Sequence, residues 1–277
     1  LSIYNPTYDS NQVSRNMVQL NRSGNQFSEI GYMTGMHATD WSWACLMQDF
    51  DLDGRVDVYI ANGYVSDLSD QDYVYNLNTT FGKKRGGIQA LREPNYLFRQ
   101  TDDLTFTNVA ADWNVNDTSS SFGSAWADLD GDGDVELIVA NFDTTMFVYR
   151  NNAREQGRGH SLSLQFHGQG GNPAGLGAKI RVVAGDASYY RENYTVRGYQ
   201  STMDATMVVG LGNAKQADSL IVTWPDGTTD IQLGVRADTV ISLWQRKAVK
   251  PQAPYFALPH PSTTTFMDVT SMLGIDY

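Results

Sequence analysis

Short runs of apolar residues, many of them β-branched or aromatic, follow one another along the chain between turns rich in Gly, Asn and Asp. In several runs apolar and polar positions alternate, which is the period of a half-buried strand and not that of a helix. In the first half of the chain these runs lie near residues 16–20, 27–31, 42–48, 56–61, 95–99, 106–110, 121–127 and 135–140. The pattern therefore predicts an all-β fold.

The runs also repeat along the chain. An offset of 79 residues separates Phe27 from Phe106 and holds well beyond this pair. Other matched positions are Asn16 with Asn95, Ser42 with Ser121 and Asn62 with Asn141. We expect each unit to contain four short strands, which is the size of one β-propeller blade. Residues 64–94 would then be an insertion between two blades.

Two acidic loops occupy equivalent places in the two units, at residues 49–57 and 128–136. Both read Asp-x-Asp-x-Asp-Gly-x-x-(Asp/Glu), which places oxygen ligands at alternate positions of a tight turn. Such a set suits Ca²⁺, which takes about 6–8 oxygen ligands. We therefore predict two calcium sites. The predicted ligands are the carboxylates of Asp49, Asp51, Asp53, Asp128, Asp130 and Asp132, the backbone carbonyls of Arg55 and Asp134, and the closing carboxylates of Asp57 and Glu136.

Several features of these loops favour a calcium site. Carboxylates this close together repel one another without a cation. Gly54 and Gly133 stand at position six, where the turn favours positive φ. Mg²⁺ fits less well because it prefers a stricter octahedron and retained water. An EF-hand does not fit, because position twelve is Ile60 or Val139 and the loop exits are typical of strands. A solvated Asp/Gly turn without metal is the remaining alternative.

Residues 161–245 alternate short apolar runs with Gly, Asn and Asp turns, which predicts an antiparallel β-sandwich or barrel. The glycines within 168–177 are more typical of turns than of a phosphate-binding loop, because no Lys-Ser/Thr pair follows and the next run reads as a strand. We expect Trp224 to be a buried packing residue and not a sugar-binding platform.

The acidic units resemble FG-GAP/VCBS repeats, and residues from about 161 to 245 resemble the ASPIC/UnbV domain. The second resemblance is carried by residues 172–181, 197–201, 209–212 and 222–227. The combination implies calcium-bound β-propeller blades, a binding or adhesion role, and no established catalytic residues. These modules occur together in cartilage acidic protein-like chains and large bacterial outer-surface proteins. The resemblance therefore also implies an extracellular or bacterial cell-surface location, associated with the outer membrane.

The expected organisation has four parts. Residues 1–155 contain two blades, residues 156–247 the ASPIC/UnbV domain, residues 248–265 a Pro-rich linker, and residues 266–277 the start of a further blade. Two complete blades are too few to close a propeller. The predicted fold is thus all-β, with an incomplete propeller and a sandwich-like domain. We expect the remainder of a longer parent polypeptide, or another subunit, to complete the propeller.

Composition narrows the range of partners. The formal net charge is −11, which argues against nucleic-acid binding because that needs Lys and Arg to replace counterions. No apolar stretch approaches the ~20 residues that span a bilayer, so we expect no direct membrane span. Cys45 is the only cysteine. An internal disulfide is therefore impossible, and we expect Cys45 to be a small buried hydrophobe.

The leading hypothesis is a non-catalytic calcium-binding protein, secreted or on the cell surface, that mediates adhesion or binds a glycan or protein ligand within a larger assembly. One alternative is a polysaccharide-processing hydrolase subunit with a carboxylate pair. It is disfavoured because most acidic residues lie in the loops, the His residues show no metal-ligand spacing, and no Gly-x-Ser-x-Gly elbow is present. The other alternative is a purely architectural subunit of an outer-membrane complex.

Overall fold

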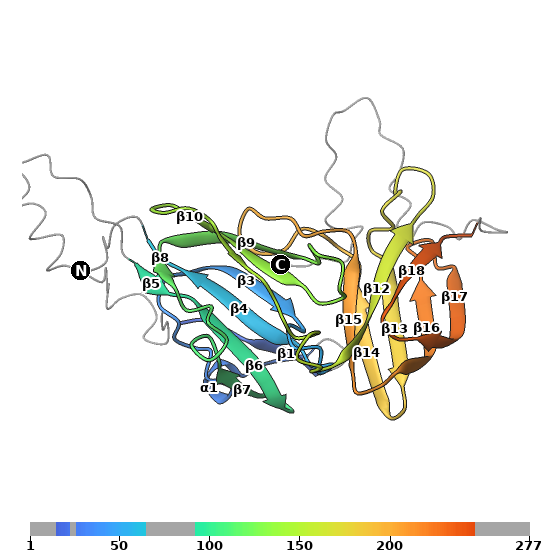
Figure 1. The fold of residues 1–277 in the computed structure, drawn as a ribbon, viewed down its shortest axis with the longest axis horizontal. Coiled ribbons are helices and arrows are strands. Elements are labelled where there is room, and N and C mark those ends of the chain that lie inside the picture. Colours follow the sequence, from blue (N-terminus) through green and yellow to red (C-terminus); the bar gives the residue numbers. More distant parts are fainter. Residues whose placement is uncertain (1–14, 23–25, 65–91, 247–277) are drawn as a thin grey trace, which may run out of the picture.

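The computed structural model describes residues 15–22, 26–64 and 92–246. Within these residues the regular structure is β, as expected, apart from one short helix, α1 (Gly31–Thr34). The expected Pro-rich linker, the further blade and most of the expected insertion lie outside the described residues. Figure 1 shows two groups of sheets side by side, with β1–β11 in blue to green and β12–β18 in yellow to red.

Among the described residues, three antiparallel sheets and one short ladder make up the first group. The central sheet is a meander in the order β3-β4-β6-β7, with strands Ser42–Gln48, Asp57–Asn62, Tyr96–Asp102 and Thr105–Asn108. The sheet before it in the chain is β1-β2, with strands Gln19–Asn21 and Phe27–Glu29. The sheet after it is β11-β10-β9, with strands Phe147–Tyr149, Glu136–Asn141 and Ser121–Ala127. The short ladder pairs β5 (Glu93–Pro94) with β8 (Thr118–Ser119).

The strand pairings confirm that the 79-residue repeat is structural. Every residue pair between β3 and β4 has its equivalent between β9 and β10, and the same holds for β1-β2 and β6-β7. Examples are Met47↔Val58 with Trp126↔Leu137, Ser42↔Asn62 with Ser121↔Asn141, and Gln19↔Glu29 with Phe98↔Asn108. The turns repeat as well, since Gly35 and Asn114 both adopt a positive φ, 75° and 58°.

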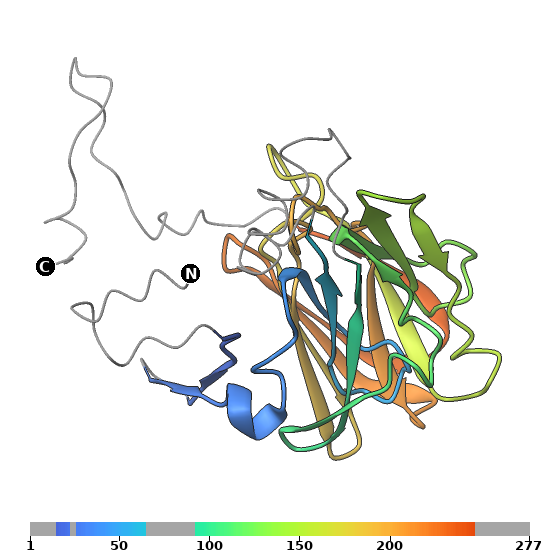
Figure 2. The same cartoon turned by 90° about the vertical axis from the view of Figure 1, so that its left-hand side faces the viewer.

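The expected grouping of strands into sheets is wrong. One sequence unit per sheet is the prediction, whereas β3 and β4 of the first unit pair with β6 and β7 of the second. The junction is the antiparallel pairing of β4 with β6, for example Val58↔Phe98. A repeat length fixes the distance between equivalent strands but not the point at which a sheet ends. The boundaries of the sheets are consequently shifted by half a repeat unit relative to the boundaries of the sequence units. Figure 2 shows the β1-β2 pair and α1 at the outer edge of the molecule.

Two sheets make up the second group. One has the order β15-β12-β18 and the other the order β14-β13-β16-β17. The expectation of purely antiparallel pairing is wrong for one pair, because β12 and β18 run parallel. In chain order the strands are β12 His160–His167, β13 Lys179–Ala184, β14 Ala187–Glu192, β15 Met207–Gly212, β16 Gln216–Thr223, β17 Thr229–Arg236 and β18 Thr239–Trp244.

The two sheets of the second group share one apolar core. Leu162 and Leu164 of β12 meet Ile180 of β13 and Leu220 of β16 in a single buried cluster. Trp224 belongs to the same cluster, with 2% of its surface exposed. Its indole Nε1–H donates to Asp230 Oδ2 at 2.9 Å, which satisfies the one polar group of the ring. The expected packing role of Trp224 is confirmed.

The expected burial of Cys45 is wrong. Side chains alternate across β3, and the core face is occupied by Ala44, Leu46 and Gln48. Cys45 and Met47 lie on the opposite face and are exposed. The period of a strand therefore decides the environment of Cys45, and an apolar run alone does not indicate which face is buried.

The second group of strands packs directly against the first acidic loop. The backbone N–H of Gly212, the last residue of β15, donates to the Leu52 carbonyl at 2.9 Å. Gly210 lies so close to the loop that a Cβ there would be 1.9 Å from Asp49 Oδ2. A Cβ on Gly159 would be 2.1 Å from the Leu52 carbonyl oxygen. Glycine at these positions lets the two backbones touch.

Replacing Gly210 with alanine tests this close packing. The added Cβ would also come within 3.0 Å of the Leu52 Cα, so the loop must shift, and we expect a loss of about 1–3 kcal/mol in the free energy of unfolding. Urea unfolding followed by circular dichroism measures the loss. Gly171→Ala is the matched control, because no atom of the described residues lies within 4 Å of a Cβ there. Equal stability of the two variants would contradict the packing.

Candidate metal centre

The first acidic loop brings three of the predicted ligands together. Asp49, Asp51 and Asp53 lie on the turn between β3 and β4, and one carboxylate oxygen from each lies within 4.8 Å of the other two. Leu52 and Gly54 adopt positive φ values of 60° and 89°, and these left-handed residues curl the loop. Asp49 and Asp51 are almost completely buried, with 1% and 2% of their surfaces exposed.

The closing carboxylates bind backbone amides in both loops. Asp57 accepts hydrogen bonds from the backbone N–H groups of Phe50 and Gln100, both at 3.0 Å. Its counterpart Glu136 accepts from the N–H of Leu129 at 2.7 Å. Asp57 thus fixes the first turn of its loop to β6, and it does not lie in the three-carboxylate group. Glu136 does lie in a carboxylate group of its own loop.

Arginines surround the first loop. Arg99 on β6 donates to Asp51 Oδ2 at 2.5 Å and to Asp53 Oδ2 at 3.0 Å. Arg158 lies 3.9 Å from Asp51. The side chain of Arg55 is half-exposed and lies 3.6 Å from Asp53, to which its backbone N–H donates. The sequence pattern does not predict Arg99 at this position, because it reaches the loop only through the pairing of β4 with β6.

The second loop forms two overlapping carboxylate groups. One contains Asp128, Asp130 and Glu136, and the other contains Asp130, Asp132 and Glu155. Glu155 follows β11 and is outside the loop motif, so the motif could not identify it. Its presence adds a candidate ligand to those predicted from the sequence.

The turn geometry of the second loop matches that of the first. Gly131 and Gly133 adopt positive φ values of 78° and 96°, and their N–H groups donate to the two carboxylate oxygens of Asp128. The Asp134 carboxylate accepts from the N–H of Arg154 at 2.9 Å and lies outside both carboxylate groups. The expected positive φ at position six is therefore confirmed in both loops.

Burial makes these carboxylates difficult to ionise. It raises the pKa of Asp49 well above its ordinary value, and it raises the pKa values of Asp57 and Asp134 to about 7. Desolvation is the largest cause in all three cases, and repulsion from neighbouring carboxylates adds to it. A bound cation would reverse the shifts, because it favours the charged form.

Orphaned oxygen atoms test whether the loops fit a cation. One carboxylate oxygen of each of Asp49, Asp51, Asp132 and Asp134 is buried and has no hydrogen-bond partner among the described residues. Such atoms are costly unless something binds them. The groups contain carboxylates alone, and all-oxygen donor sets are those that Ca²⁺ prefers. Both loops therefore fit a calcium ion, which would supply the positive charge that their ionised carboxylates need.

One comparison with known proteins identifies part of the chain. Residues 168–250 match the family model described as ASPIC and UnbV. This segment is an ASPIC/UnbV domain. The predicted resemblance is confirmed there, whereas the resemblance of the acidic units to FG-GAP/VCBS repeats stays a prediction. No curated protein matches the chain in sequence. In the part of the chain that the structure describes, no helix is long and apolar enough to cross a membrane.

Two segments that carry the ASPIC/UnbV resemblance contact the acidic half of the chain, which consists of the first group of strands (β1–β11) and the two acidic loops. Residues 209–212 include Gly210 and Gly212, which abut the first loop. Residues 197–201 include Gly198, where a Cβ would lie 3.0 Å from a methyl carbon of a β3 leucine side chain. The second loop is also held, because Ser161 Oγ donates to the Gly133 carbonyl at 2.6 Å. Residues that carry the resemblance therefore contact the acidic half, and one of them, Gly210, is buried there.

The metal-free protein should lose stability as pH rises from about 4 to about 7. Asp57 and Asp134 have folded-state pKa values of about 7 against an ordinary value of 3.8. Over this range the unfolded chain releases protons that the folded chain retains, so the free energy of unfolding falls. Thermal unfolding in a chelator at about pH 5 and about pH 8 measures the fall.

Two variants separate this effect from the general effect of net charge. Asp57→Asn removes one of the titrating groups and should reduce the difference in Tm between the two pH values. Asp103→Asn changes an exposed side chain outside the loops and should leave the difference as in the wild type. The prediction is wrong if the two variants behave alike.

Proposed function

We propose that the chain is a non-catalytic calcium-binding protein, secreted or on the cell surface, that mediates adhesion or binds a glycan or protein ligand within a larger assembly. The observation that carries the proposal is the set of buried carboxylate oxygens without partners, which occurs in both acidic loops. The recurrence matters, because two loops at equivalent positions of a structural repeat have the same left-handed turns and the same closing hydrogen bond.

Each acidic loop would hold one Ca²⁺. In the first loop the ion would be held by Asp49, Asp51 and Asp53, and in the second by carboxylates of the two overlapping groups, with Glu155 as an additional ligand. Asp57 and Glu136 bind backbone amides, which supports a role in closing the loops. The proposal also includes direct binding of the ion by Asp57 and by the backbone carbonyls of Arg55 and Asp134.

The acidic units would be FG-GAP/VCBS blades of an incomplete β-propeller. Support comes from β3-β4-β6-β7, which is a four-stranded antiparallel meander as in a blade. The sheet β11-β10-β9 repeats its first two strands, and β1-β2 repeats its last two. On this interpretation the three sheets are one whole blade between parts of two others. The parent polypeptide or another subunit would supply the missing strands.

Calcium would have a structural role that extends beyond the blades. The first loop contacts Gly159, Gly210 and Gly212 of the second half, and the second loop contacts Ser161. An ion that fixes the loops would therefore also fix the ASPIC/UnbV domain against the blades. An extracellular location fits this role, because extracellular modules commonly bind calcium at about 10⁻⁴–10⁻³ M.

Chelation should lower the melting temperature. At free calcium about a hundredfold above Kd, one site adds ~2.7 kcal/mol to folding, which corresponds to roughly 5–10 °C for a chain of this size. Differential scanning calorimetry with calcium and then with EDTA measures the shift. Asp49→Asn and Asp128→Asn should each lose part of it. A Tm that is the same in both buffers would rule out structural calcium.

Replacing Arg99 with glutamine should lower the Tm of the metal-free protein and raise the affinity of the protein for calcium. Asp51 and Asp53 lose the nearest of their arginines, so the Tm in EDTA falls. Calcium and Arg99 compete for the same carboxylates. With the arginine removed, we expect the affinity of the loop for calcium to rise by up to about tenfold. Isothermal titration calorimetry measures the affinity. Arg181→Gln is the control, because Arg181 bonds Ser188 Oγ, away from the loops. Unchanged or weaker calcium binding in the Arg99 variant would contradict the expected competition.

A further inference from the structure

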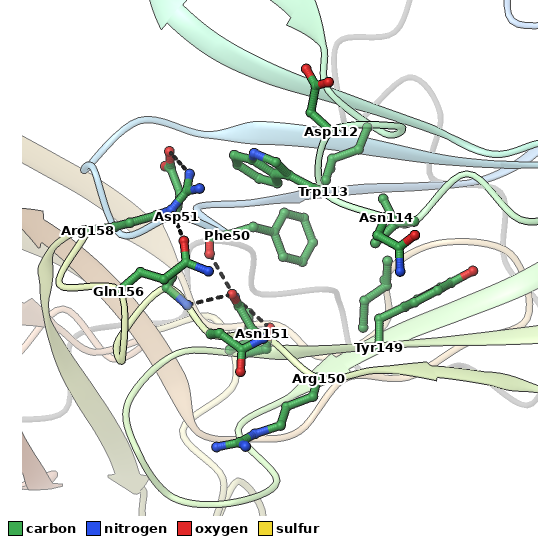
Figure 3. Close-up of a pocket in the computed structure, with 16 residues that line it drawn as sticks. Phe50, Asp51, Asp112, Trp113, Asn114, Tyr149, Arg150, Asn151, Gln156 and Arg158 are labelled. Carbon is green, nitrogen blue, oxygen red and sulfur yellow. Dashed lines mark hydrogen bonds and ion pairs between the residues drawn. The ribbon is translucent and has the colours of Figure 1, made fainter.

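A cavity of about 210 Å³ lies between the two acidic loops. Figure 3 shows that its walls come from separate parts of the chain, with Phe50 and Asp51 of the first loop, Trp113 and Asn114 of the turn after β7, and Tyr149 at the end of β11. The volume is smaller than the roughly 300–1,000 Å³ of pockets for drug-sized ligands. The cavity therefore has room for one ring-sized group.

Aromatic and aliphatic side chains form the inner wall of this cavity. Phe50 is buried, while Trp113 and Tyr149 are half-buried and pack on the core of the acidic half. The Arg158 guanidinium lies 5.2 Å from the centre of the Trp113 ring. The Tyr149 hydroxyl donates to Asp117 at 2.9 Å, which fixes the orientation of the ring. Arg158 therefore covers part of Trp113, and the apolar face of a ligand would meet Tyr149 and the part of Trp113 that Arg158 leaves open.

Polar side chains line the exposed part of the same cavity. Asp112, Asn114 and Asn152 are exposed cavity residues. Within the described residues, none of their side-chain polar atoms takes part in a hydrogen bond, whereas some other polar groups of the lining are engaged. The Asn151 side chain, for example, donates to the carbonyls of Phe50 and Val135 and so ties the two loops together. Three side chains remain available to a ligand, and they offer both donors and acceptors.

The charges of the cavity favour an uncharged ligand. Its two arginines are already paired, Arg150 with Asp130 and Glu155, and Arg158 with Asp51 at 3.9 Å. The carboxylate of Asp112 is left as a free acceptor. It would repel an anion and would accept hydrogen bonds from hydroxyl groups, and such charge-assisted bonds are the stronger ones.

We propose that this cavity binds one ring of an uncharged sugar. The sugar's apolar face would lie against Trp113 and Tyr149, and its hydroxyl groups would bond Asp112, Asn114 and Asn152. The inference deepens the proposed function, on which it rests, by assigning the glycan and its site. Two cavity residues, Phe50 and Asp51, belong to the first acidic loop, so removal of calcium should weaken sugar binding.

Saturation-transfer NMR with the whole chain in calcium buffer tests the proposal. The probes are glucose, galactose, mannose, xylose and N-acetylglucosamine, each titrated separately. At least one should receive saturation from the protein. In the double variant Asp112→Ala/Asn114→Ala its Kd should rise by about tenfold or more, since two hydrogen bonds are lost. Both side chains are exposed, and an unchanged Tm would show that the double variant folds.

Trp244→Ala is the control for surface stacking. Trp244 is 67% exposed and stacks on His167 in β12, within the other half of the chain, so its loss should leave the Kd unchanged. The proposal is overturned if no probe sugar binds, if binding survives in the double variant, or if binding depends on Trp244 instead. It is also overturned if uncharged peptides bind the cavity and the sugars do not.

Calcium titration of the same samples by calorimetry separates this proposal from the proposed metal sites. Calcium binding without sugar binding would overturn the sugar site and leave the metal sites standing. Sugar binding without calcium binding would overturn the metal sites and leave the cavity assignment intact. Sugar binding that weakens in EDTA supports both.

Discussion

Repulsion among buried carboxylates is the constraint on which the acidic half of the molecule depends. Each loop gathers several acidic side chains where water cannot fully solvate them, and ionising them together is expensive. Backbone amides and arginines offset part of this cost. Each of Asp49 and Asp51 has a buried oxygen that no described residue binds, and these atoms mark the part of the cost that is not offset. The loops are therefore the place where a bound cation would stabilise the fold most.

That stabilisation would extend beyond the loops because the ASPIC/UnbV domain rests on them. The backbone at Gly210 and Gly212 is in direct contact with the first loop. Asp51 of the same loop also lines the cavity between the loops. The first loop thus connects β3 to β4, packs against the ASPIC/UnbV domain and lines the cavity.

Local features of the chain could be predicted from sequence, and long-range ones could not. The positions of the strands and the left-handed turns at Gly54 and Gly133 follow from spacing. Arg99 and Glu155 could not be found that way, because they reach the carboxylates through tertiary packing. The exposure of Cys45 and the parallel β12–β18 pair also depend on which faces and edges meet in space.

The half-unit shift of the sheets has a consequence for how such a chain can be shortened or lengthened. A cut at the end of the first sequence unit, just after β4, would leave the edge of that strand without β6 and expose its N–H and C=O groups to aggregation. A cut between β2 and β3 would pass between sheets. Segments that are exchanged or deleted in this protein should therefore begin and end at sheet boundaries. Each segment would then begin with the β-hairpin that carries its acidic loop.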